Sequence, residues 1–113
     1  MSSLFTKIIN KEIPSNIIYE DDEIIAFDDI DPKAPIHILI VPKKEISTLN
    51  DIENNDRSTI GNMFIIAKKL AKKFNIDKTG YRTVFNCNED GGQTVSHIHL
   101  HLLGGRKFSW PPG

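Results

Sequence analysis

Apolar positions recur along this chain with a helical period in two segments. Residues three and four apart lie on the same face of a helix, so a stripe with this spacing predicts an amphipathic helix. The longer segment predicts one helix over residues 56–74, with a single apolar face. The residues of that face are Ile60, Met63, Phe64, Ala67, Leu70, Ala71 and Phe74. The same spacing at Leu4, Phe5, Ile8 and Ile9 predicts a short helix before Pro14.

Five other segments are short and rich in β-branched or apolar residues, which is typical of strands. The acidic residues 20–22 separate the first two of these segments and predict a hairpin, while Pro35 and Pro42 bound the third. The strands and helices do not alternate regularly. We therefore expect an α+β fold, with an antiparallel five-stranded sheet, one long helix and one short helix. The expected strands are residues 17–19, 23–27, 36–41, 81–86 and 97–103.

Length and charge restrict the class of protein. A chain of 113 residues is long enough for one compact domain and too short for two, so we expect a single domain over residues 1–113. Hydrophobic residues make up 39% and the net charge is -1, which indicates a soluble globular protein without the basic excess that nucleic-acid binding needs. The lysines of residues 68–73 suit the negative end of a helix, although a nucleic-acid patch is the alternative.

Two further features bear on the location of the protein. No apolar run approaches the roughly 20 residues that span a bilayer, so we expect no membrane association. The single cysteine, Cys87, cannot form an internal disulfide, which favours a reducing compartment.

The segment over residues 97–103 carries the most informative pattern. His97, His99 and His101 alternate with Ile98 and Leu100. Successive side chains of a strand point to opposite faces, so the three histidines should share one face, about 6.5–7 Å apart, and the apolar residues the other. We expect the apolar face to pack on the core and the histidine face to lie at the surface.

Three interpretations of these histidines are open. A purely structural role for the histidines is the least favoured interpretation, because side chains in a row at the surface are not held in a core. A zinc site is the second, since histidines at i and i+2 can reach one ion. The third ring would lie about 13 Å from the first, so such a site would need another ligand, and Cys87 is the only thiol.

The third interpretation is nucleophilic catalysis at phosphorus, which we favour. A neutral imidazole attacks phosphorus when one ring nitrogen is free and the other is held by an acceptor. Neighbouring imidazoles can bind the phosphate oxygens and discourage one another's protonation. The preceding Gly91-Gly92-Gln93-Thr94 segment could add backbone N–H groups and side-chain donors for the phosphate.

These motifs resemble those of the histidine triad superfamily, in which three histidines alternate with apolar residues. Residues 97–103 fit every position of that motif. Gly91-Gly92-Gln93 before it, and Gly104-Gly105-Arg106 and Trp110-Pro111-Pro112-Gly113 after it, resemble the Hint branch, the purine nucleoside phosphoramidases. The resemblance extends over residues 4–113.

The resemblance implies a role for each catalytic position. His99 matches the nucleophile, and His97 would orient its ring through a backbone carbonyl. His101 would contact the phosphate, and His37 matches a fourth histidine of the active site. Thr94 lies near the leaving group in this alignment, where serine is usual in the family.

The resemblance also implies a set of substrate contacts. Asp29 matches the acid that binds the ribose hydroxyls, with Ile30 beside it, and Trp110 matches an aromatic residue that reaches the partner's site in a homodimer, across which the sheet continues. The residues matched to the apolar purine slot are Leu4, Phe5, Ile8, Ile13 and Phe27. Those matched to the phosphate side are Asn86, Gly92, Gln93 and Thr94.

The implied activity is hydrolysis of the P–N bond of purine nucleoside phosphoramidates, of the adenosine 5′-phosphoramidate or aminoacyl- and lysyl-AMP type. The reaction would pass through a nucleotidyl intermediate on His99, without a metal or other cofactor, in a cytoplasmic protein that could also enter the nucleus. Two alternatives remain open: a hydrolase of dinucleoside polyphosphates or nucleotidyl sulfates, and a non-catalytic dimer that senses nucleotides. Asp28, where many relatives have histidine, adds negative charge near the nucleotide.

Overall fold

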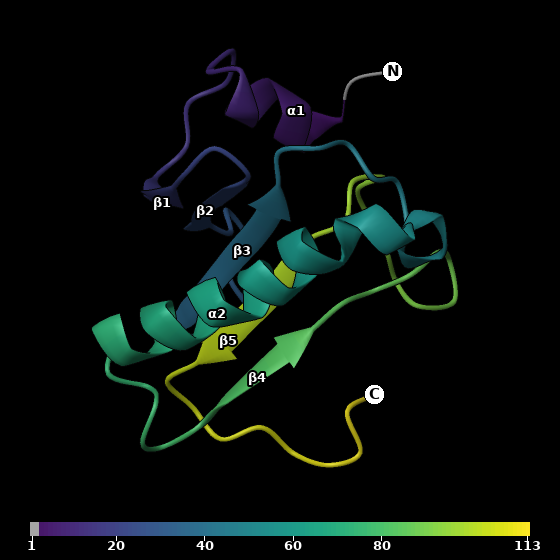
Figure 1. Ribbon diagram of the computed structural model, residues 1–113. Coiled ribbons are helices and arrows are strands. Elements are labelled where there is room, and N and C mark those ends of the chain that lie inside the picture. Colours follow the sequence, from purple (N-terminus) through teal and green to yellow (C-terminus); the bar gives the residue numbers. More distant parts are fainter. Residues whose placement is uncertain (1–2) are drawn as a thin grey trace.

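The computed structural model describes residues 3–113, and its five strands form one antiparallel sheet (Figure 1). The sheet order is β1-β2-β3-β5-β4, so β5 lies between β3 and β4. The strands are β1 (Ile17–Glu20), β2 (Ile24–Asp28), β3 (Ile36–Pro42), β4 (Tyr81–Val84) and β5 (Leu100–Gly104). The helices are α1 (Leu4–Ile9) and α2 (Arg57–Lys73), with two short 3-10 turns, η1 (Leu49–Asp51) and η2 (Asn54–Asp56), that the sequence did not predict. The predicted α+β class is therefore confirmed.

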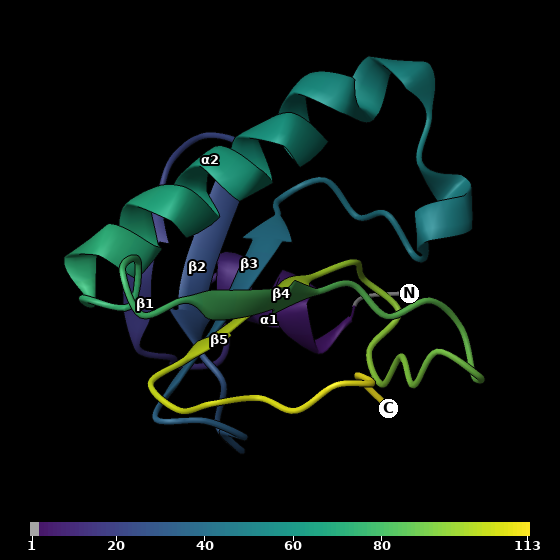
Figure 2. The ribbon, with the colours of Figure 1, turned by 90° about the horizontal axis from the view of Figure 1, so that it is seen from below.

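The two helices cover opposite faces of the sheet (Figure 2). Residues of α2 pack on one face, against side chains such as Ile38 and Leu102 that are fully buried. Phe5 and Ile8 of α1 pack on the other face, against Phe27 and neighbouring apolar residues. The central strands are consequently buried on both sides, which explains why β2 and β3 are almost continuously apolar.

The apolar face of α2 differs from the predicted stripe. Phe64 belongs to the predicted stripe but is 45% exposed, and Ile66 is buried although it was not part of the stripe. Each helical residue is rotated by about 100° from the one before it, and the sheet contacts only the narrow face that contains Met63 and Ala67. Phe64 instead lies beside Phe85, with ring centroids 6.0 Å apart. None of the helices within residues 3–113 has the length and apolarity needed to cross a membrane.

The histidine segment also differs from its prediction. Strand β5 begins only at Leu100, so His97 and His99 precede the strand. Ile98 and Leu100 are buried as predicted, but the histidines do not form a surface row, because His97 is 0% and His99 5% exposed. The covering helix α1 explains this difference, since the ring of its Phe5 lies against both histidines.

Candidate active site

His99 is held in one tautomer with one ring nitrogen open. Its Nδ1 lies 2.8 Å from the carbonyl oxygen of His97, which can only accept a hydrogen bond. The neutral ring therefore carries its proton on Nδ1 and a lone pair on Nε2. Within residues 3–113 no hydrogen-bond partner contacts Nε2, and the ring of His99 lines a cavity. Such an imidazole is arranged as a nucleophile.

The surroundings of His99 keep its ring neutral. Burial lowers the pKa of His99, and the hydrogen bond to the His97 carbonyl opposes that effect only in part. The edge of the Phe5 ring packs against the imidazole, with centroids 4.9 Å apart and planes at 77°. The helix α1 thus supplies both the apolar surroundings and the steric wall that fix this ring.

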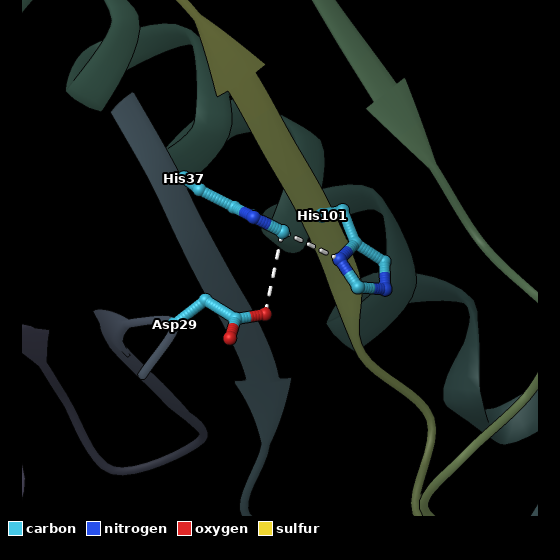
Figure 3. Close-up of side chains that lie close together, drawn as sticks. All are labelled: Asp29, His37 and His101. Carbon is cyan, nitrogen blue, oxygen red and sulfur yellow. Dashed lines mark hydrogen bonds and ion pairs between the residues drawn. The ribbon is translucent and has the colours of Figure 1, made fainter. Parts of the chain in front are cut away.

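A second pair of histidines joins strands β3 and β5. His37 Nε2 lies 2.9 Å from His101 Nδ1, and the Asp29 carboxylate lies 3.4 Å from the same His37 nitrogen (Figure 3). The backbone N–H of Lys33 donates to His37 Nδ1 at 3.0 Å, so the neutral His37 carries its proton on Nε2. His37 must then donate to His101 Nδ1, which leaves His101 with an N–H on Nε2.

His101 is the histidine that resists protonation most clearly. Burial, together with the positive charges that His99 and His37 would carry, lowers its pKa to about 4. Burial also lowers the pKa of His37, although the nearby Asp29 carboxylate opposes the shift. At neutral pH these imidazoles are uncharged donors and acceptors in fixed tautomers.

His97 is fully buried and does not line the cavity that contains the other two histidines of the triad. Its Nε2–H donates to the Pro42 carbonyl at 2.7 Å, and its Nδ1 lies 3.0 Å from the Ser3 hydroxyl. The same hydroxyl accepts from the Thr6 backbone and caps α1. The backbone carbonyl of His97 makes the contact to His99 that the sequence predicted, whereas its side chain anchors α1.

A cavity of about 180 Å³ lies between α1 and the sheet and contains both His99 and His101. All five residues expected for the purine slot line it: Leu4, Phe5, Ile8, Ile13 and Phe27. Asp29, Ile30 and Thr94 also line it, as expected. Further lining residues that the sequence analysis did not assign to the site are Pro14, Ser15, Leu39 and Val95. Leu39 could have been found, because it is two residues beyond His37 on the same face of β3.

His37 and His97 do not line this cavity, and neither do four of the expected substrate contacts: Asn86, Gly92, Gln93 and Trp110. The N–H groups of Gly92 and Gln93 donate to Glu89 and Asn88 within their own turn, so they are not free phosphate donors. The Gln93 side chain donates to the Ser47 and Val95 carbonyls and joins two loops. Asn86 binds the Gly91 carbonyl, and Trp110 is 81% exposed.

The cluster of Asp29, His37 and His101 has the residue types of a metal site, with ligand atoms within 4.8 Å of one another. Its hydrogen bonds fit a chain of donors and acceptors that runs from Lys33 through His37 to His101 better than they fit a metal site. A metal-bound histidine normally donates its second N–H to an acceptor, but the second nitrogen of His37 faces the Lys33 N–H, which is a donor. Cys87, the thiol considered for a zinc site, does not belong to this cluster.

Known proteins resemble this chain over most of its length. A family model described as the HIT domain matches residues 10–108. The chain belongs to the HIT domain family. An uncharacterized HIT-like protein of Buchnera aphidicola subsp. Baizongia pistaciae is 56% identical over 107 residues, covering 95% of this chain and 96% of that protein.

Solved structures of HIT proteins share the whole fold. A HIT family hydrolase from Legionella pneumophila Philadelphia 1 is 54% identical, with a TM-score of 0.97 over 99% of this chain and 100% of that one. A histidine triad nucleotide-binding protein from Candida albicans is 31% identical, with a TM-score of 0.83 over 99% of this chain and 85% of that one. The predicted superfamily is thereby confirmed. These matches do not distinguish the Hint branch from other HIT proteins.

Proposed function

We propose that this HIT protein is a hydrolase of purine nucleoside phosphoramidates that works through a nucleotidyl intermediate on His99. The observation that supports it most directly is the state of His99. Its Nδ1–H is held by the His97 carbonyl, its Nε2 has no hydrogen-bond partner within residues 3–113, and the ring lines a cavity. A ring in this state needs no base to remove a proton before it attacks.

The substrate is proposed to lie with its base at the apolar end of the cavity. Phe5 and Phe27 provide aromatic surface for a purine. The Asp29 carboxylate suits the ribose, because it accepts hydroxyl hydrogen bonds and repels a bare phosphate. The α-phosphate would then lie beside His99 and His101, whose Nε2–H is available to a phosphate oxygen.

The reaction is proposed in two displacements. His99 Nε2 forms a bond to the α-phosphorus while the P–N bond breaks, and the amine leaves after it takes up one proton. Water then attacks the phosphorus, the bond to Nε2 breaks, and the nucleoside monophosphate and one proton are released. The His101 Nε2–H and the Thr94 hydroxyl stabilise the phosphoryl oxygens and the departing nitrogen. Splitting one displacement into two lowers the barrier of each.

Other parts of the proposal concern the class of reaction and the assembly. The Legionella relative is described as a hydrolase and the Candida relative as nucleotide-binding, which supports a nucleotide hydrolase here.

We also propose a homodimer that forms through the side of α2 and β4 where Phe64, Ile65 and Tyr81 are exposed. Trp110, 81% exposed near the end of the chain, would then contact the partner.

The decisive experiment compares wild type with His99→Ala and His99→Asn on adenosine 5′-phosphoramidate. Loss of the nucleophile should lower kcat/KM by at least about 10³-fold. Brief reaction followed by mass spectrometry should detect an AMP adduct on residue 99 of wild type. Near-normal turnover in either variant would contradict the covalent mechanism.

The same assay separates the alternative functions. Dinucleoside polyphosphates and adenosine phosphosulfate are measured beside the phosphoramidate, and the highest kcat/KM identifies the preferred bond. Nucleotide affinity without turnover of any of these substrates would indicate a sensing protein instead.

A further inference from the structure

A groove adjoins the catalytic cavity on the side of Thr94. Leu4, Thr94 and Val95 line both hollows, so the groove opens directly from the cavity. The other residues that line the groove are Ser3, Glu45, Ser47 and Ser96. Its chemistry differs from that of the apolar purine end, because it combines three serine hydroxyls with one carboxylate.

Hydrogen bonds join the segments that line the groove to the residues that lead to His99. The Ile98 N–H donates to the Ile46 carbonyl at 2.8 Å, so the chain after β3 lies alongside the chain that leads to His99. The Gln93 side chain donates to the Ser47 carbonyl at 2.7 Å and holds the loop before His97 to the same segment. The Ser3 hydroxyl completes the wall through its contact with His97. The segments that line the groove are therefore hydrogen-bonded to the residues on either side of Thr94 and around His99.

Glu45 gives the groove its charge. Among the described residues that line the groove it is the only ionisable one. The two lysines before it are engaged elsewhere, because Lys43 pairs with Glu20 and Lys44 with Asp56. Within residues 3–113, Glu45 makes no ion pair of its own. Burial lowers the pKa of His97, and the Glu45 charge partly offsets that shift, which places the carboxylate within electrostatic range of the active site.

Building on the proposed function, we propose that this groove holds the leaving amine and that Glu45 selects amines that carry a second, cationic group. The leaving nitrogen departs beside Thr94, and whatever is attached to that nitrogen must extend into a neighbouring space. An ammonium or guanidinium group there would meet the Glu45 carboxylate, with the serine hydroxyls as further acceptors. A carboxylate in the same place would be repelled.

The experiment uses three adenosine phosphoramidates whose leaving amines have the same length and differ at the far end. These amines are 1,3-diaminopropane, 3-aminopropanol and β-alanine, which end in an ammonium, a hydroxyl and a carboxylate. Wild type should cleave the ammonium substrate with a kcat/KM about 5-fold above the hydroxyl substrate, as expected for a partly exposed ion pair, and the carboxylate substrate should be slowest. Added salt should reduce the difference.

Variants at residue 45 test the cause of that preference. Glu45→Gln should bring the ammonium-to-hydroxyl ratio close to one, and Glu45→Lys should favour the carboxylate substrate. Asp77→Asn is the matched control, because it removes one negative charge from the exposed loop after α2 and should leave the wild-type ratios unchanged. Equal rates of wild type on all three substrates, or a Glu45→Gln variant that keeps the preference or slows all three substrates uniformly, would overturn the inference.

An assay with unsubstituted adenosine 5′-phosphoramidate shows whether a negative result concerns the role of Glu45 or the proposed function itself. If wild type does not cleave it, the proposed function fails and the role of Glu45 fails with it. If wild type cleaves it but shows no preference among the three amines, only the role of Glu45 is overturned.

Discussion

His37 Nε2 lies 2.9 Å from His101 Nδ1, and this hydrogen bond determines which nitrogen of His101 carries the proton. His37 is itself fixed by the Lys33 N–H at its other nitrogen. The Lys33 N–H, which precedes β3, thereby determines that His101 on β5 presents its Nε2–H to the cavity. We therefore propose that His37 acts through His101 as a positioning residue.

Loss of this contact should lower activity without removing the nucleophile. His37→Leu should reduce kcat by about 10–100-fold, the usual cost of losing a residue that orients a catalytic group. His37→Gln keeps an N–H near the position of Nε2 and should recover part of the activity. In ¹⁵N NMR spectra, His101 should be protonated on Nε2 in wild type and in mixed tautomers in His37→Leu. An unchanged tautomer in the leucine variant would contradict this role.

The pH dependence of stability should reflect the buried histidines. Burial lowers the pKa of His37, His97 and His99, and that of His101 falls to about 4. The unfolded chain binds protons near pH 6.5 while the folded chain does not, so the free energy of unfolding should fall as the pH drops below about 6.5. Denaturant unfolding between about pH 5 and 7.5 measures this slope, because ion-paired carboxylates contribute only below about pH 4.5.

Two measurements check the origin of that slope. NMR titration should give His101 a pKa near 4, as its burial requires. His101→Asn should unfold with a shallower dependence on pH than wild type. A stability that does not change between neutral pH and about pH 5 would show that the histidines titrate normally.

Replacing Gly91 and Gly61 by alanine should have opposite effects on the free energy of unfolding. A Cβ at Gly91 would overlap the Cys87 carbonyl oxygen, whereas a Cβ at Gly61 on α2 meets nothing within 4 Å. Gly91→Ala should therefore cost at least about 1 kcal/mol of unfolding free energy and displace the turn before the histidine segment. Gly61→Ala should stabilise the protein by about 0.5–1 kcal/mol, because alanine favours the helix. Urea unfolding of both variants tests the contrast.

The proposed homodimer predicts that a charge at Phe64 separates the subunits. Phe64 is 45% exposed beside Phe85, next to the edge strand β4. Wild type should sediment with twice the mass of the chain, and Phe64→Glu should sediment as a monomer. Ile17→Glu is the control, because Ile17 is 36% exposed on β1 at the opposite edge of the sheet, and it should leave the dimer intact. A wild-type monomer at micromolar concentration would contradict the proposal.

The sequence by itself determined the elements and the apolar layers of this protein. Helical spacing identified α1 and α2, and alternation showed that Ile98 and Leu100 would be buried. These are local periodicities, which act over a few residues and need no knowledge of distant partners. The family resemblance then indicated His37 and His99, and the rings of both lie beside His101.

Only the tertiary structure decided how these residues meet. Alternation could not show that α1 would cover the histidine face, because which face is covered depends on a helix some ninety residues earlier. The pairing of β3 with β5 brings His37 to His101, and the loop contacts of Gln93 take its amide away from the cavity. Only the tertiary structure likewise brings Glu45 and Thr94 to the lining of one groove. Such contacts join residues far apart in sequence, and they are set by the order of strands and by packing rather than by local pattern.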